Sequence, residues 1–194
     1  HEKGESNIFS LMNPEHFSGA VILKDSIQTE KAADMLEKRL KDNLNKPTVV
    51  IAKESDIFPS IYIDSYSAVF DIISHLITVH NCKDIAFVSG KKWHRHSKER
   101  LQAYRDAMEK AGLTVSENRI FYGDYWYQSG EVYAEQLLSQ GETLPDAIAC
   151  ANDQMAIGIC KAFNAHGIRV PEDVRVVGYD STYEGKTSTC SITS

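Results

Sequence analysis

The sequence lacks the features that mark several classes of protein. No run of about 18 apolar residues occurs in the 194 residues, so no membrane-spanning helix is expected. Lys and Arg number 21 against 27 Asp and Glu, and the resulting net charge of -6 makes this chain poorly suited to bind a nucleic-acid backbone. The charged segment His1–Ser6 is followed by no apolar signal region, so nothing predicts secretion.

Cysteine is scarce and unpaired in the sequence. Cys82, Cys150, Cys160 and Cys190 form no CxxC motif, and two of them lie within apolar or helical patterns. This usage favours reduced cysteines that pack as small hydrophobes in a cytoplasmic protein.

Motifs for catalysis and metal binding are also missing. The sequence has no GxSxG, HExxH, Walker or GxGxxG motif, so we expect no enzyme activity and no cofactor. His94 and His96 are two positions apart, a spacing that is not helical, and no third ligand lies near them. A polar loop is therefore favoured there over a metal site.

From residue 64 onward, short β-branched runs alternate with helical patterns, which is typical of parallel α/β sheets. The predicted strands are 84–89, 119–123, 147–151 and 174–178. The predicted helices are 67–78, 97–111, 128–139 and 153–166. The first 64 residues offer only strands at 19–23 and 48–52, a helix at 29–43 and an extended run at 60–63. We therefore place a boundary near residue 64.

Ligands of open parallel sheets bind beyond the carboxyl ends of the strands. The four loops at these ends contain both tryptophans, several tyrosines and hydrogen-bonding groups of several kinds. Flat aromatic faces beside such groups suit a small polar ligand, such as a sugar or a nucleoside. The candidates are Trp93, His96, Arg100, Tyr125, Trp126, Asn152 and Asp180.

Each candidate also has a purely structural interpretation. Asn152 or Asp153 could cap the following helix, and Asp180 could be a turn residue. Arg100 could pair with a nearby Glu on a solvated helix face. Trp126 could pack on the domain surface.

Two stretches of this region carry a resemblance to a known family. Residues 145–158 read PDAIACANDQMAIG and residues 167–180 read GIRVPEDVRVVGYD. Together with residues 17–22, FSGAVI, they resemble the effector-binding core of the lac repressor and galactose repressor family. This resemblance covers essentially the whole chain.

The resemblance implies a type I periplasmic-binding-protein-like fold with two α/β lobes and an effector clamped between them. Residues 1–64 would be part of an incomplete N-terminal lobe, and residues 65–194 a C-terminal lobe with a flavodoxin-like parallel sheet. The family's effector contacts fall on Arg100, Asn152 and Asp180, with Tyr125 and His96 at further contact positions. Ala52-Lys53 stands where many sugar-binding members carry a carboxylate, which argues against a plain hexose.

By this resemblance the function is effector sensing in a cytoplasmic transcription regulator, a homodimer that binds DNA only through a head domain absent from this chain. An alternative host is a diguanylate cyclase (GGDEF protein) or a histidine kinase, whose sensor regions share the phrase at residues 75–80, HLITVH. A periplasmic solute-binding protein is a further alternative, which four unpaired cysteines argue against.

Overall fold

The computed structural model describes residues 15–27, 30–43, 46–52, 54–141, 143–190 and 192–194. The charged segment His1–Ser6, for which we predict no secretion signal, lies outside the described residues. Two compact units divide between Ile63 and Asp64. No helix in the described part of the chain is long and apolar enough to span a membrane.

The first unit contains a short parallel sheet. Its strands, in the order β1-β2-β3, are β1 (Ala20–Leu23), β2 (Thr48–Ile51) and β3 (Ser60–Ile61). A 3-10 turn, η1 (Lys24–Ser26), follows β1, and helix α2 (Glu30–Asn43) connects it to β2. A small core joins the sheet to α2 through Ile22, Leu36, Leu40 and Val50.

A buried ion pair joins η1 to α2 in this unit. Lys24 Nζ lies 2.8 Å from Glu37 Oε1, and both side chains are almost fully buried. Lys24 also donates to the Glu54 carbonyl at 3.3 Å, and Ser55 Oγ donates to Glu37 Oε2 at 3.0 Å. These added hydrogen bonds offset part of the cost of removing the two charges from water.

The second unit is built on a four-stranded parallel sheet in the order β5-β4-β6-β7. Its strands are β4 (Ile85–Ser89), β5 (Ile120–Tyr122), β6 (Ala147–Cys150) and β7 (Arg175–Val177). Its helices are α3 (Ser65–Thr78), α4 (Arg95–Lys110), α5 (Tyr127–Ser139), α6 (Asp153–Ala165) and the short α7 (Tyr183–Thr187), with a 3-10 turn, η2 (Glu117–Arg119), before β5.

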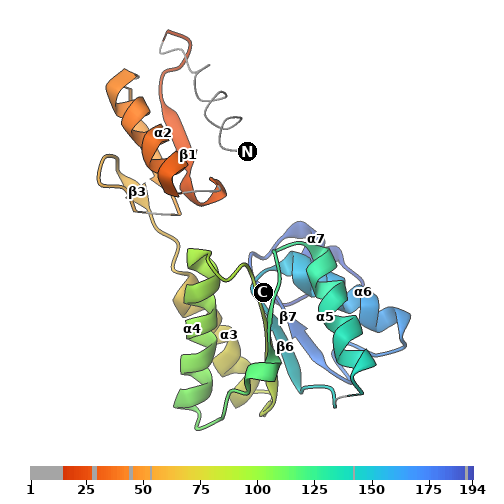
Figure 1. Ribbon diagram of the computed structural model, residues 1–194. Helices are drawn as coiled ribbons and strands as arrows, with labels where there is room; N and C mark the ends of the chain where they lie inside the picture. Colours follow the sequence, from red (N-terminus) through yellow and green to blue (C-terminus); the bar gives the residue numbers. More distant parts are fainter. Residues whose placement is uncertain (1–14, 28–29, 44–45, 53, 142, 191) are drawn as a thin grey trace. The chain divides into compact units, whose positions relative to one another are not determined.

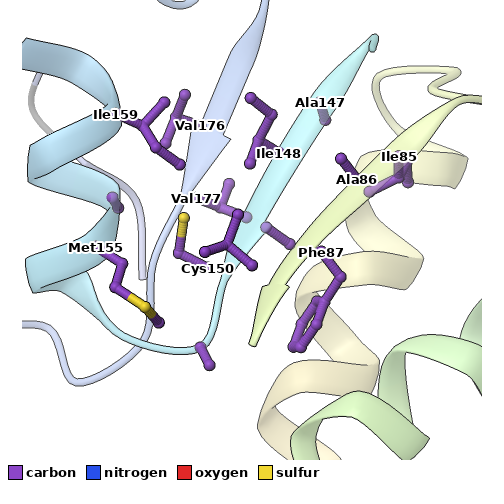
Figure 2. Packing of buried hydrophobic residues seen from close by; sticks show 14 of the residues in the cluster. Ile85, Ala86, Phe87, Ala147, Ile148, Cys150, Met155, Ile159, Val176 and Val177 are labelled. Carbon is purple, nitrogen blue, oxygen red and sulfur yellow. The ribbon is translucent and has the colours of Figure 1, made fainter. Parts of the chain in front are cut away.

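Helices cover both faces of this sheet, with α3 beside α4 and α5 beside α6 (Figure 1). Figure 2 shows Ile159 of α6 next to Val176 of the sheet, while Phe87 points toward the other helix layer. There Phe87 stacks on Tyr104 of α4, with ring centroids 5.0 Å apart. The Tyr104 hydroxyl donates to the Ile85 carbonyl at 2.7 Å, and burial raises the pKa of Tyr104 to about 12. The continuous apolar strands follow from burial on both faces.

The predicted strands and long helices of this unit are confirmed, with bounds that differ by one or two residues. Helix α4 begins at Arg95 rather than Ser97. In the first unit, the extended run predicted at 60–63 pairs only at Ser60–Ile61. Helix α7 was not predicted, because five residues are too few to show a helical period. That residues 1–64 form an incomplete lobe stays a prediction.

Two glycines set the distance between α5 and α6. A Cβ at Gly130 of α5 would lie 2.0 Å from the Met155 carbonyl oxygen of α6. A Cβ at Gly158 of α6 would lie 1.9 Å from the Tyr127 carbonyl oxygen of α5. Both obstacles are backbone atoms, so neither helix can relieve the clash by a side-chain rotation. The contact also fixes the first turns of both helices, and the loops of the candidate site lead into these turns.

We expect Gly130→Ala and Gly158→Ala to destabilise the protein, although alanine favours helices. The added methyl forces the helices apart, at a cost of about 1 to 3 kcal/mol in the free energy of unfolding. Urea denaturation measures this cost. Gln136→Ala, an exposed position on α5, is the control and should change stability by less than about 0.5 kcal/mol. Unchanged stability in both glycine variants would contradict the close contact.

The four cysteines are free thiols that differ in exposure. Cys82, Cys150 and Cys160 are buried, and Cys190 is half-buried. Burial raises the pKa of the Cys82, Cys150 and Cys160 thiols. The thiolate is the reactive form, so these three thiols should react slowly for two reasons: reagents cannot reach them, and they stay protonated.

Cys190 should therefore react first with an aromatic disulfide reagent in the native protein at neutral pH. The other three thiols of this chain should react only on unfolding. Absorbance of the released thiolate gives the rates, and Cys190→Ser should remove the native-state phase. Four equal native rates would show that the core opens more readily than its packing implies.

Candidate functional site

The carboxyl ends of the four strands of the second unit meet at one edge of its sheet. The strands are parallel, with Ser89 opposite Tyr122, Val88 opposite Cys150, and Ala149 opposite Val177. The loops at residues 90–94, 123–126, 151–152 and 178–182 therefore leave the sheet on the same side. All seven candidate residues belong to these loops or to the first two turns of α4.

Arg100, in the second turn of α4, is buried at this edge and is 8% exposed. Its guanidinium carbon lies 3.6 Å from the centroid of the Tyr179 ring, a cation–π contact. Its Nη1 donates to the Ala151 carbonyl at the end of β6. Within the described part of the chain, its buried Nε has no hydrogen-bond partner. The sequence left open a solvated Arg100 paired with a Glu, and this interpretation is wrong.

Asn152 is the N-cap of α6. Its Oδ1 accepts from the Met155 backbone N–H at 3.1 Å, and its Nδ2 donates to the Tyr125 carbonyl at 2.9 Å. The side chain therefore holds the Tyr125 loop against the start of α6. Of the two capping alternatives left open by the sequence, Asn152 is correct and Asp153 is wrong, because Asp153 already lies within the helix.

Tyr125 is packed by its neighbours into one orientation. Its backbone has a positive φ of 75°, which the hydrogen bond from Asn152 helps to maintain. Its hydroxyl lies 2.6 Å from Ser97 Oγ, and its ring fills the space beside Gly90, where a Cβ would lie 2.1 Å from the ring. Ring contacts continue from Tyr125 to His94 at 5.5 Å and from His94 to Trp93 at 5.7 Å.

His96 is buried at the first turn of α4. Its Nδ1 lies 3.3 Å from Glu99 Oε2 and 3.4 Å from Ser65 Oγ. The Tyr179 hydroxyl donates to the same Ser65 Oγ at 3.4 Å. His96 therefore joins a polar network that ends at the ring under Arg100.

Asp180 lies on a loop with unusual backbone geometry. Its φ is 109° and that of Ser181 is 52°, so two consecutive non-glycine residues have positive φ. Desolvation by neighbouring atoms raises the pKa of Asp180, while the positive charges of Arg100 and His96 lower it and the negative charge of Asp153 raises it. Asp180 is therefore electrostatically coupled to two other candidates.

The two tryptophans lie at the rim of this edge. Trp93 is 60% exposed and Trp126 is 62% exposed. The backbone N–H of Trp126 donates to Asp124 Oδ1 at 3.1 Å, and Ser129 Oγ donates to the same oxygen. These hydrogen bonds lower the pKa of Asp124, that of Ser129 having the larger effect. Both rings are thus exposed to solvent, and that of Trp126 stands on a loop held by these hydrogen bonds.

These contacts link Arg100 to His96 through Tyr179 and Ser65, and Asn152 to Tyr125. Asp180 is an exposed residue that is coupled electrostatically to Arg100 and His96. Sequence reasoning missed Tyr179 and Ser65, which support Arg100 and His96. Tyr179 stood in a loop that the sequence singled out, beside Asp180. Nothing in the sequence pointed to Ser65, because its partners are 31 and 114 positions away.

No group of three or more His, Cys, Asp or Glu side chains in the described ranges is arranged to hold a metal ion. The chemistry of this edge is that of hydrogen bonding: a buried guanidinium, a carboxylate, amide and imidazole groups, and exposed aromatic faces. Such a set can bind the hydroxyls and flat faces of a small polar molecule.

Comparison with known proteins identifies the family of this chain. Residues 73–194 match the family described as a periplasmic binding protein-like domain. Catabolite control protein A of Priestia megaterium is 30% identical over 182 residues, covering 92% of this chain and 52% of the relative. The HTH-type transcriptional repressor CytR of Escherichia coli is 30% identical over 145 residues, covering 73% of this chain and 42% of the relative.

A solved structure agrees with both relatives. The sugar-binding transcriptional regulator of the LacI family from Escherichia coli, complexed with phosphate, superposes with a TM-score of 0.74 at 26% identity. The alignment covers 90% of this chain and 61% of that one. The chain thus spans about half the length of the curated relatives it matches. The resemblance noted in the sequence is confirmed: the chain belongs to the periplasmic binding protein-like domain family, and its relatives are LacI-type transcription regulators.

Proposed function

We propose that this chain is the effector-binding part of a LacI-type transcription regulator, and that its effector binds at the carboxyl edge of the second unit's sheet. The observation that carries the proposal is Arg100. It is a buried guanidinium, stacked on Tyr179, with a buried Nε that has no partner among the described residues. A buried donor without a partner costs stability, and such a cost is typical of functional sites.

The side chains favour a small polar effector with apolar faces, either sugar-like or nucleoside-like. Arg100 donates hydrogen bonds and Asp180 accepts them, which suits a molecule with several hydroxyls. Trp93 and Trp126 offer exposed ring faces for stacking. Asn152 and Tyr125 already bond to each other, so they shape the site more than they add free hydrogen-bonding groups.

The family also suggests the kind of protein to which this chain belongs, its oligomeric state and its location. We propose a cytoplasmic homodimer that binds DNA through a separate head domain. The relatives described above are transcription regulators, which favours this host over a diguanylate cyclase, a histidine kinase or an enzyme that acts on the ligand. Effector binding would change DNA affinity by favouring one of two conformations.

Thermal-shift measurements on the full-length protein can first identify the effector class. A suitable set of compounds is ribose, glucose, cellobiose, sucrose, adenosine and cytidine. We expect saturable stabilisation by at least one compound, because a ligand that binds only the folded state raises its stability. Stabilisation by none of them, combined with effector-independent DNA binding, would contradict the proposed function.

Asp180→Asn and Arg100→Met should each weaken binding of that compound by about 1 to 3 kcal/mol, because each removes a charged hydrogen-bonding partner of the bound compound. Asparagine tolerates the positive φ at position 180, and methionine keeps most of the apolar contact on Tyr179. Isothermal titration calorimetry gives the affinities. Asp71→Asn, an exposed position on α3, is the matched control and should bind normally. Normal affinity in both site variants would overturn the site assignment.

Effector affinity should also depend on pH through Asp180. Its pKa is raised by desolvation, so the carboxylate takes up a proton at a higher pH than an ordinary aspartate does. Protonation removes the charged acceptor, so affinity should fall as the pH drops from neutral through this raised pKa. Titrations between about pH 7 and pH 4, a range that spans the ordinary pKa of aspartate and the values above it, should show this loss. Asp180→Asn should flatten the profile, and a profile that Asp180→Asn leaves unchanged would exclude Asp180 as its source.

A further inference from the structure

Asp153 is a buried carboxylate to which the function proposed above gives no role. It is 1% exposed, at the first position of α6. Its Oδ2 accepts from the Thr182 N–H at 2.7 Å, from Thr182 Oγ1 at 2.9 Å and from Ser194 Oγ at 3.4 Å. Its own N–H donates to the Tyr179 carbonyl at 2.9 Å. One residue therefore contacts both ends of the loop at residues 179–182.

The surroundings of this carboxylate are shaped to accept it. A Cβ at Gly178 would lie 2.2 Å from Asp153 Oδ1, and a Cβ at Gly185 would lie 2.8 Å from Oδ2. Neither glycine has a positive φ, so each is needed here for space and not for backbone freedom. The carboxylate thus fills a gap that exists only because both positions lack a side chain.

The loop that Asp153 holds carries two groups of the proposed site. Tyr179 lies under the Arg100 guanidinium, and Asp180 follows with its φ of 109°. Positive φ at two consecutive non-glycine residues costs free energy, so surrounding contacts must maintain it. The contacts at Tyr179 and Thr182 enclose the two strained residues. A second bridge, from the Ser181 N–H to Ser194 Oγ at 2.9 Å, leads back to Asp153.

Helix stability alone does not account for this residue. Asn152 already caps α6, and Oδ1 of Asp153 is buried with no hydrogen-bond partner among the described residues. A buried acceptor without a partner lowers stability. The bonds that Asp153 does make are directed to the loop and to Ser194, not to its own helix.

We infer that Asp153 is a positioning residue of the effector site, whose carboxylate holds the loop at residues 179–182 so that Asp180 and Tyr179 meet Arg100 in the binding arrangement. This inference rests on the proposed function, and it adds a residue that does not touch the effector. Gly178 and Thr182 take part in the same arrangement, since Gly178 leaves space for the carboxylate and Thr182 donates hydrogen bonds to it.

The first test needs no effector. In the full-length protein, Asp153→Ala should speed amide exchange at Thr182 by at least about tenfold, because that N–H loses its acceptor. Asp153→Asn keeps a side-chain oxygen and should restore most of the protection. Both variants remove a negative charge near Asp180, so both should lower the pKa of Asp180 measured by carbon-13 NMR. Unchanged exchange at Thr182 and an unchanged Asp180 pKa would overturn the inference.

The second test uses the compound that binds best among the six sugars and nucleosides above. Asp153→Ala should weaken its affinity about tenfold or more, which corresponds to the loss of a charged hydrogen bond. Asp153→Asn should recover it to within about threefold, since the loop contacts remain. Thr182→Val removes one of the two donors that Thr182 offers to Asp153. Its affinity for the compound should lie between those of Asp153→Ala and Asp153→Asn.

A matched control separates positioning from loss of stability. Asp146 also accepts from two backbone N–H groups, those of Lys83 at 2.7 Å and Asp84 at 3.0 Å, at the amino edge of the same sheet. Asp146→Ala should lower the melting temperature but leave affinity unchanged. If Asp180→Asn weakens binding while Asp153→Ala does not, the inference fails and the proposed function stands. If neither weakens binding, the site itself is wrong.

Discussion

The structure of the second unit depends on strand β6, which pairs with β4 on one side and β7 on the other. All four of its residues are buried, and two of them, Ala147 and Ala149, point to the same face of the sheet and are small enough to let the helix layer on that face approach closely. Because the strand is central and parallel to its neighbours, its end fixes where the other loops meet. The Ala151 carbonyl that anchors Arg100 and the Asn152 side chain that anchors Tyr125 both follow directly from it.

The loops at this edge are held by side chains rather than by regular secondary structure. Asn152 fixes Tyr125, Asp153 fixes the loop of Tyr179 and Asp180, and Ser65 joins Tyr179 to His96. Each of these bonds links segments far apart in the sequence. The shape of the candidate site therefore depends on these side-chain hydrogen bonds. The glycine contact between α5 and α6 contributes by fixing the helix ends that carry two of these loops.

Much of the fold could be predicted because parallel strands and their helices have distinct sequence periods. The runs around Phe87, Ile148 and Val176 are continuously apolar, and this pattern requires burial on both faces. The edge that carries the candidate site was chosen from the sequence, since ligands of such sheets bind at the carboxyl ends of strands. The resemblance then selected Arg100, Asn152 and Asp180 within that edge.

The roles of individual side chains could not be predicted in this way. The contact of Arg100 with Tyr179 depends on a loop with positive φ, and sequence patterns do not encode that geometry at non-glycine residues. The partners of Asp153 were missed for a different reason: its neighbours Thr182 and Ser194 are 29 and 41 positions away in the sequence. The interpretation of Asp153 as a simple helix cap failed because Asn152 takes that role.

A crystal structure of the full-length protein with its tightest-binding sugar or nucleoside would test the central claim most directly. The account predicts electron density for the ligand at the carboxyl edge of the second unit's sheet. Its polar atoms should lie within hydrogen-bond distance of Arg100 and Asp180, and the loop at residues 179–182 should keep its contacts with Asp153. Ligand density at the amino edge near Asp146, or a ligand without contact to either Arg100 or Asp180, would contradict the account.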